Sequence, residues 1–282
     1  MDHKFSENIK GRVNLDFFSS DKDVHGAGTK LKYAYLDFKK VLPIPESKFT
    51  FGLQKTYFGT IYDWKYITIQ KALEDKEKVI SSTDYGVALF GYIPKGFGEY
   101  AVSILNGEGY KKTGGDINIK PAYLANLRVI PIPGVTLGGS VLYEERGTEY
   151  DKRLLYAGVV RTAFGPVDIW SEYLMAERGE FNNPTKSVGF MVMPILKLAN
   201  LTGADVELVA RYDKWDKDTD IEDDAHSRVT GGFNWYIQRR AKGKPAVMLQ
   251  ANYERTSYEN SGKDPKDNLM VQFRWEFASK PF

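Results

Sequence analysis

The sequence predicts an all-β fold, namely a transmembrane antiparallel up-and-down β-barrel of about 14 strands, although 12 to 16 strands also fit the pattern. Three observations lead to this prediction. Apolar and polar residues alternate with a period of two along successive runs of about ten residues, the length of a tilted membrane strand. The links between the runs are alternately short and long. Aromatic residues lie near the ends of many runs, where membrane barrels carry girdles of amphipathic rings.

The alternation is clearest in the first and last runs. The apolar residues of these runs are Ile9, Val13, Leu15 and Phe17, then Leu269, Val271, Phe273, Trp275 and Phe277. They alternate with Lys10, Arg12, Asn14 and Asp16, then with Met270, Gln272, Arg274 and Glu276. Successive side chains of a strand point to opposite faces, so each run has one apolar and one mostly polar face. Similar runs recur from residue 49 to residue 253, and weaker ones cover 31–38, 123–129, 167–175 and 188–192.

The aromatic residues near the run ends form the expected girdles. They are Tyr33, Tyr57, Tyr85, Tyr100, Tyr143, Tyr156, Tyr173, Tyr212, Trp235 and Tyr253. Aromatic residues also favour strands in general, so the girdle depends on the alternation being correct.

The connections sort into two classes. Short turns rich in Pro and Gly lie at 43–45, 94–96, 131–134, 164–166, 200–203 and 241–244. Longer, charged links lie at 21–30, 59–83, 106–116, 177–186, 213–225 and 255–267. Short turns on one side and long loops on the other are the outer-membrane arrangement, and a soluble β-sandwich has no reason to sort its loops in this way.

The composition excludes several classes. The chain has 282 residues and no Cys, so it holds neither a disulfide framework nor a thiolate metal site. Its net charge of +2 indicates no nucleic-acid partner. It contains no apolar stretch of about 18 residues, as a transmembrane helix would require. The polar start, Met1 to Lys10, carries no secretory signal, so we expect a mature chain of a protein of the bacterial outer membrane, with residues 1–282 forming one barrel domain.

If the apolar faces meet lipid, the opposite faces line the interior, which about 14 strands leave wide enough for water. The basic residues expected there are Lys10, Arg12, Lys32, Lys48, Arg128, Arg153, Arg161, Arg211, Arg228 and Arg274. Four of them, Lys10, Arg12, Lys32 and Lys48, fall on the first three strands, and a positive wall would favour anions. The simpler interpretation, slightly favoured, is a weakly selective interior with paired charges.

The longest link, 59–83, has a helix-like middle and many bulky residues. We expect it to fold into the lumen as a constriction loop rather than to pack over the barrel mouth. It would then bring Lys65, Lys71, Lys76 and Lys78 near the narrowest point.

No motif indicates catalysis, a cofactor or a metal. The spacing of Asp216, Asp218 and Asp220 resembles the start of an EF-hand, but Ile221 stands where that loop requires Gly. The three His residues have no Ser or Asp partner at a catalytic spacing. We therefore expect no enzyme, no catalytic residues, no cofactor and no bound metal.

Several segments resemble the phosphate-selective porin O and P family. They are Gly52–Thr56, Gly98–Gly109, Leu208–Asp213, Gly232–Ile237 and Ala251–Glu254, spread over almost the whole chain. The resemblance implies a water-filled outer-membrane pore, often trimeric, in which lumenal Arg and Lys guide anions past an infolded loop. It places none of the family's phosphate-binding lysines on particular positions here.

These observations favour a porin through which small hydrophilic solutes diffuse passively, with a mild preference for phosphate-like anions. Its expected partners are outer-membrane lipid and lipopolysaccharide, the solutes or ions themselves, and two further copies in a homotrimer. The first alternative is a structural barrel that sheathes a partner protein such as an electron-transfer cytochrome. A soluble β-sandwich that binds carbohydrate, and a barrel hydrolase using His226, are further alternatives.

Overall fold

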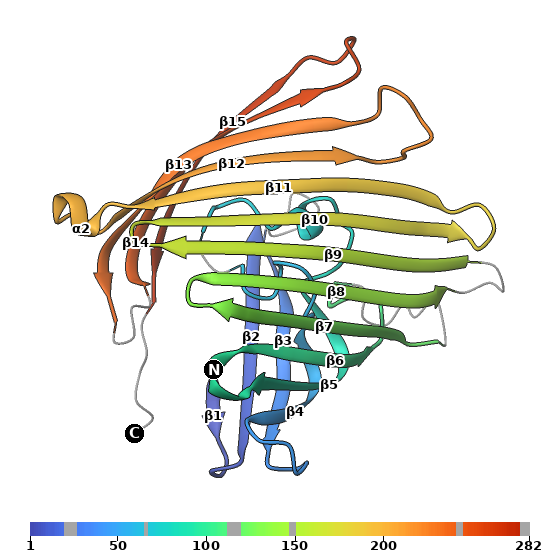
Figure 1. Ribbon diagram of the computed structural model, residues 1–282, viewed down its shortest axis with the longest axis vertical. Coiled ribbons are helices and arrows are strands. Elements are labelled where there is room, and N and C mark those ends of the chain that lie inside the picture. The colour runs from blue at the N-terminus through green and yellow to red at the C-terminus, as the bar shows by residue number, and fades with distance from the viewer. Residues whose placement is uncertain (20–26, 65–66, 112–119, 147–150, 241–244, 277–282) are drawn as a thin grey trace.

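The computed structural model describes residues 1–19, 27–64, 67–111, 120–146, 151–240 and 245–276, and these form one antiparallel sheet (Figure 1). Each strand pairs with its neighbours in the chain, in the order β1 to β15. The strands are β1 (Asp2–Lys4), β2 (Ile9–Ser19), β3 (Ala27–Lys39), β4 (Ser47–Lys55), β5 (Thr83–Ile93), β6 (Gly98–Leu105), β7 (Ala122–Ile132), β8 (Val135–Arg146), β9 (Asp151–Phe164), β10 (Val167–Glu180), β11 (Thr185–Lys197), β12 (Val206–Asp216), β13 (His226–Arg239), β14 (Pro245–Tyr258) and β15 (Lys266–Trp275). The short helices are α1 (Leu73–Lys76), η1 (Pro94–Gly96) and α2 (Ala199–Thr202).

The expected up-and-down barrel is the observed architecture. The sheet curls around an interior, and β7 to β12 cross the middle of the view in Figure 1. One side carries the short turns, such as those after β7 and β9 and the one containing α2; the other carries the longer connections. No helix in the described part of the chain is both long enough and apolar enough to cross a membrane.

The outer face is an apolar band. Val102, Leu127 and Tyr173 point outward from β6, β7 and β10 and keep 50%, 51% and 52% of their surface exposed. Their chain neighbours, such as Ala101 and Leu174, are fully buried. A soluble protein rarely shows so continuous an apolar surface, whereas hydrocarbon accepts it without penalty. The outer face therefore fits contact with lipid.

Two irregularities change which side chains face inward. The β2–β3 ladder shifts register between Asn14 and Leu15, so that Asn14 pairs with Tyr33 and Leu15 with Leu31. As a result Tyr33 lies beside the inward guanidinium of Arg12, with its ring centroid 4.9 Å away, and the prediction of Tyr33 in the outer girdle is wrong. In β4, Gly52 has φ of +119° and a Cβ there would lie 2.3 Å from the Ala34 carbonyl, so the backbone conformation requires Gly. The pairing register is unbroken at Gly52, and the next residue, Leu53, is fully buried between its partners Ala34 and Tyr85.

The interior holds a hydrophobic core, which the expectation of a wet, polar inner face did not include. Apolar side chains of the β4–β5 connection, among them Phe58, Leu73 and Ile80, are buried. They pack with inward residues of β5 to β12, such as Trp170 and Met193. Tyr57, predicted in the girdle, is buried in this core and stacks on Phe90 at 5.1 Å, so that prediction is also wrong. The infolded segment thus gives the inner wall apolar partners.

The two edges of the sheet are β15 and the β1–β2 hairpin. Within the described residues no pairing joins β15 to β2, and Asp2–Lys4 lies on the free edge of β2 opposite residues 10–12. Without the three-residue β1, the fifteen strands become fourteen, an even number, so β2 and β15 run antiparallel and have the directions needed for pairing. An edge left open in hydrocarbon costs several kcal/mol for each unpaired backbone group. We expect β15 to replace β1 on this edge in the membrane.

Engineered cysteines test this closure, since the chain has no Cys of its own. Val13→Cys on β2, combined in turn with Cys at Leu269, Val271 or Phe273 on β15, should give a disulfide in at least one pair, because paired strands bring Cβ atoms within bonding reach. The measurement is the mobility of the membrane-inserted protein on non-reducing gels. The matched control combines Val13→Cys with Leu137→Cys, which lies on the distant strand β8. An absence of cross-linking in every β2–β15 pair would contradict closure.

Candidate pore and its infolded loop

The β4–β5 connection, residues 56–82, is here called the inner loop. It contains α1, a single turn whose buried residues are Leu73 and Glu74. The turn is held by the Glu74 carbonyl, which accepts the Val79 amide at 2.8 Å. Lys78, at φ +57°, reverses the chain just after the turn. The inner loop bonds to side chains of strands as far apart as β6 and β14, so it spans the interior.

A buried carboxyl pair fixes the start of the inner loop. Glu74 of the loop and Glu172 of β10 both accept the Thr60 amide, at 2.7 and 3.0 Å, and Glu172 also accepts the Thr60 hydroxyl at 2.9 Å. The two carboxyl groups share the Thr60 amide at close range, and repulsion between two buried negative charges favours a proton on one of them. Burial raises the pKa of Glu74. Gly59 lies between them, and a Cβ there would be 2.2 Å from an oxygen of each.

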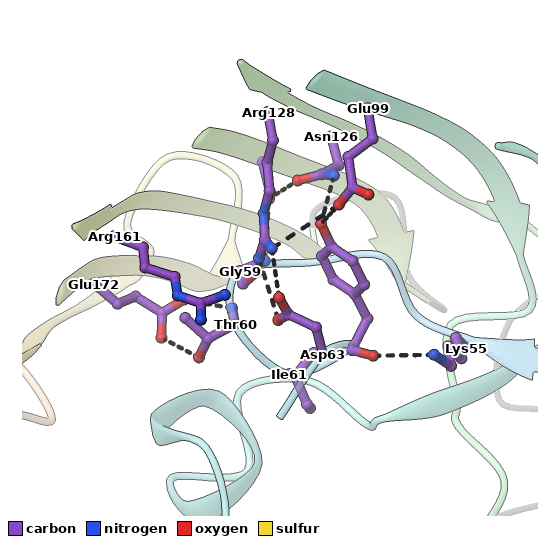
Figure 2. A network of polar contacts seen from close by, with 12 residues as sticks. Lys55, Gly59, Thr60, Ile61, Asp63, Glu99, Asn126, Arg128, Arg161 and Glu172 are labelled. Atoms are coloured by element: carbon purple, nitrogen blue, oxygen red, sulfur yellow. Dashed lines mark hydrogen bonds and ion pairs between the residues drawn. The ribbon is translucent and has the colours of Figure 1, made fainter. Parts of the chain in front are cut away.

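A cationic anchor lies next to this pair (Figure 2). The Arg128 guanidinium donates to Asp63 at 2.6 Å and to the Gly59 carbonyl at 2.5 Å. It also lies 4.4 Å from the centroid of the Tyr62 ring. Tyr62 in turn donates to Glu99 of β6 at 2.6 Å, and burial raises the pKa of its phenol. Arg128 thus holds the loop through its two terminal guanidinium nitrogens.

The far end of the loop reaches β12 to β14. Asn252 accepts the Ile69 amide at 2.7 Å, and Asn234 donates to the Ile67 carbonyl at 3.0 Å. Arg211 donates to the Lys71 carbonyl at 2.7 Å. Lys76 forms an ion pair with Glu254 at 3.3 Å. These contacts tie the loop to the wall opposite its point of origin.

A charged cluster completes the attachment. Glu77 of the loop lies 2.5 Å from the Arg228 guanidinium and 3.2 Å from His226, and Arg228 also pairs with Asp213. Burial alone would raise the pKa of Glu77, but His226 and Arg228 outweigh it and hold that pKa below its usual value. Glu77 therefore stays ionised and bonded.

The strand register places the ten predicted basic residues on the inner face, and most have a partner there. Arg128, Arg211 and Arg228 bind the inner loop as described. The others pair with acidic side chains: Arg12 with Asp2, Lys32 with Asp16, Lys48 with Asp37, Arg153 with Glu144, Arg161 with Asp168 and Arg274 with Glu276. Lys10 is exposed and faces the interior opposite Asp37. That these residues line a conducting path remains a prediction.

The three predicted loop lysines that the structure describes do not converge on one point. Lys71 is exposed and pairs with Asp75 at 3.2 Å, whereas Lys76 turns toward Glu254. Lys78 is exposed. Lys65 lies outside the described residues.

A lysine group lies where the inner loop faces β3. Lys71, Lys30 and Lys32 all act electrostatically on Lys111 of the β6–β7 connection. Burial first, and then these three cations, lower the pKa of Lys111, while Asp75 opposes them. Sequence alternation did not reveal this group, because Lys111 and Lys71 come from two different loops. Among the described residues no cluster of His, Asp or Glu is arranged to hold a metal ion.

Comparison with known proteins supports the fold. No protein-family model matches the chain, and no curated protein sequence is similar to it. Among solved structures, a loop L8 deletion variant of OmpT, an outer membrane protein of Vibrio cholerae, matches with a TM-score of 0.68 and 12% identity over 97% of this chain and 87% of that one. The outer membrane channel DcaP of Acinetobacter baumannii matches with a TM-score of 0.69 and 13% sequence identity, over 96% of this chain and 81% of the channel. A BenF-like porin from Pseudomonas fluorescens Pf-5 matches with a TM-score of 0.58 and 10% sequence identity, over 95% of this chain and 74% of the porin. The chain has the fold of outer-membrane β-barrel channels.

Proposed function

We propose that this protein is a porin of the Gram-negative outer membrane through which small hydrophilic solutes diffuse passively. The observation that carries the proposal is an apolar outer band around an interior lined by charged and hydrogen-bonded groups. Such groups facing lipid would each cost about 2–4 kcal/mol, so they belong in a water-accessible lumen. The outer band contacts lipid and lipopolysaccharide, and the resemblance to trimeric porins supports a homotrimer, testable from its mass in detergent.

The proposed path runs between the inner loop and the wall made by β2 and β3. Lys30, Lys32, Lys71 and Lys111 lie along it, with Asp16 and Asp75 as the nearby acidic groups. This excess of positive charge supports a mild preference for anions. A phosphate-like preference rests on the sequence resemblance alone.

The other candidates have less support. A sheath around a cytochrome needs an empty lumen, and the inner loop occupies much of this one. Within the described part of the chain, the His226 ring nitrogen bonds to Glu77 and Arg228, neither of which is a nucleophile, and this arrangement fixes the loop position; we therefore propose a channel without enzymatic activity.

Planar-bilayer recording tests the proposal. The wild type should form stable channels whose reversal potential under a KCl gradient indicates weak anion preference. Replacing Lys10, Arg12, Lys32 and Lys48 together by Glu changes the inner wall by about eight charges and should shift the reversal potential toward cation preference. Replacing Lys263, an exposed residue of the β14–β15 connection, by Glu is the control and should shift it much less. An unchanged potential in the fourfold variant would refute the anion preference, and an absence of channels would refute the porin.

A further inference from the structure

A cavity of about 460 Å³ lies on the inner wall, apart from the lysine group. It is lined by the ends of β10, β11 and β12 on the long-loop side and by Glu77 of the inner loop. Its volume falls in the lower part of the range of small-molecule sites, large enough for a metabolite of a few carbon atoms.

The cavity carries a cation for which the described residues supply no anionic partner. Arg178 of β10 is partly buried, and its Nε atom is buried without a hydrogen-bond partner. The charged side chain that acts electrostatically on Arg178 is Arg146, and Arg146 is itself positively charged. A buried guanidinium donor left unpaired is costly, and an incoming oxyanion would satisfy it with charge-assisted bonds.

Two further features suit an oxyanion. Lys217 lines the same cavity and forms no ion pair with any described residue. Thr185 and Ser187 also line it, and the Ser187 hydroxyl donates to the Lys217 carbonyl at 2.6 Å, fixing the strand end that carries this lysine. The one acidic lining residue, Glu77, forms an ion pair with Arg228 and a hydrogen bond to His226, so the cavity keeps a net positive charge from Arg178 and Lys217.

Trp215 supplies an apolar wall. Its side chain is almost fully buried and packs against the backbone of Gly189 on the neighbouring strand, where a Cβ would lie 2.5 Å from the indole ring. Gly189 thus makes room for the ring at the cavity. A short carbon skeleton beside a charged group would fit between this ring and the two cations.

We propose that this cavity is a binding site for small organic anions, in which Arg178 and Lys217 hold a carboxylate or phosphate group and Trp215 contacts the carbon skeleton. The proposal rests on the channel function only in that solutes reach the site through the lumen.

The test measures binding to the folded protein in detergent, without conduction. Titration with 3-phosphoglycerate should give a saturable change in tryptophan fluorescence that disappears in Trp215→Phe, while glycerol gives none. Arg178→Gln should weaken binding about tenfold or more, since a hydrogen bond to a charged group is lost. Lys217→Gln should weaken it a few-fold, and Arg178→Lys should retain part of the affinity. Arg255→Gln, on the exposed part of β14, is the control and should bind like wild type.

The outcomes separate the two proposals. Unchanged affinity in folded Arg178→Gln, or no saturable signal in the wild type, overturns the site even if the protein conducts normally. Saturable, Arg178-dependent binding in a protein that forms no channels supports the site and refutes the porin instead. The folded state of each variant is checked by the shift in gel mobility on heating.

Discussion

Replacing residues 60–80 of the inner loop by a short Gly-Ser link should raise single-channel conductance several-fold, by roughly three times or more, because an open lumen of about 14 strands is an aqueous channel. The loop fills this space in the intact protein, with Phe58, Leu73 and Ile80 packed against the wall. Arg128, Arg211 and Arg228 would lose their loop partners, but water in the widened lumen would solvate them. Trp170 and Leu174 would lose their apolar cover, so the melting temperature should fall. The first measurement is conductance in planar bilayers. The second is the melting temperature, taken as the temperature at which heating changes the mobility of the folded protein on a gel.

A matched deletion distinguishes the inner loop from loops in general. Removing residues 261–264 from the β14–β15 connection shortens a segment that is exposed throughout. Conductance should then stay within the wild-type range. Equal conductance in the two deletion variants would contradict a constricting role for the inner loop.

The strands could be predicted from sequence because lipid imposes one simple rule on them. Val102 and Leu127 must be apolar whatever lies inside, so their faces show a period of two. The rule fails where the local backbone departs from a regular strand. The register shift at Asn14 has no distinctive pattern in one sequence, so the alternation predicts the wrong face for Tyr33. The positive φ of Gly52 is equally invisible to the alternation.

The interior was harder to predict because its partners come from distant parts of the chain. Asp63 and Arg128 are 65 positions apart, and Thr60 and Glu172 are 112 apart. A single sequence gives no measure of which inward residue meets which loop residue. The useful signal was the bulky, apolar composition of residues 59–83, which indicates a buried rather than an idle loop. The same composition accounts for the apolar inner wall of β5 to β12, which needs that loop as its cover.

The carboxyl pair makes loop attachment depend on pH, and the direction follows from the raised pKa of Glu74. In the unfolded chain a Glu titrates near pH 4.3, so above about that value the packed loop binds more protons than the released one. The stability of the packed state is therefore fully present below the unfolded pKa and is lost as the pH rises through the folded pKa. At high pH the proton shared with Glu172 leaves, and two adjacent negative charges remain around Thr60.

Conductance should consequently rise and become noisier in the wild type as the pH is raised from the acid into the alkaline range, because the inner loop loosens once the raised pKa of Glu74 is passed. In Glu172→Gln the amide can donate to Glu74 as a protonated acid does, so the loop should stay packed and conductance should be nearly independent of pH. Glu172→Ala removes the hydrogen bonds and should release the loop at every pH, at a cost of about 1–3 kcal/mol to the packed state. Glu177→Gln, on the same strand and paired with Lys152, is the control and should keep the wild-type profile. If Glu172→Gln retained that profile as well, the pH response would come from another group.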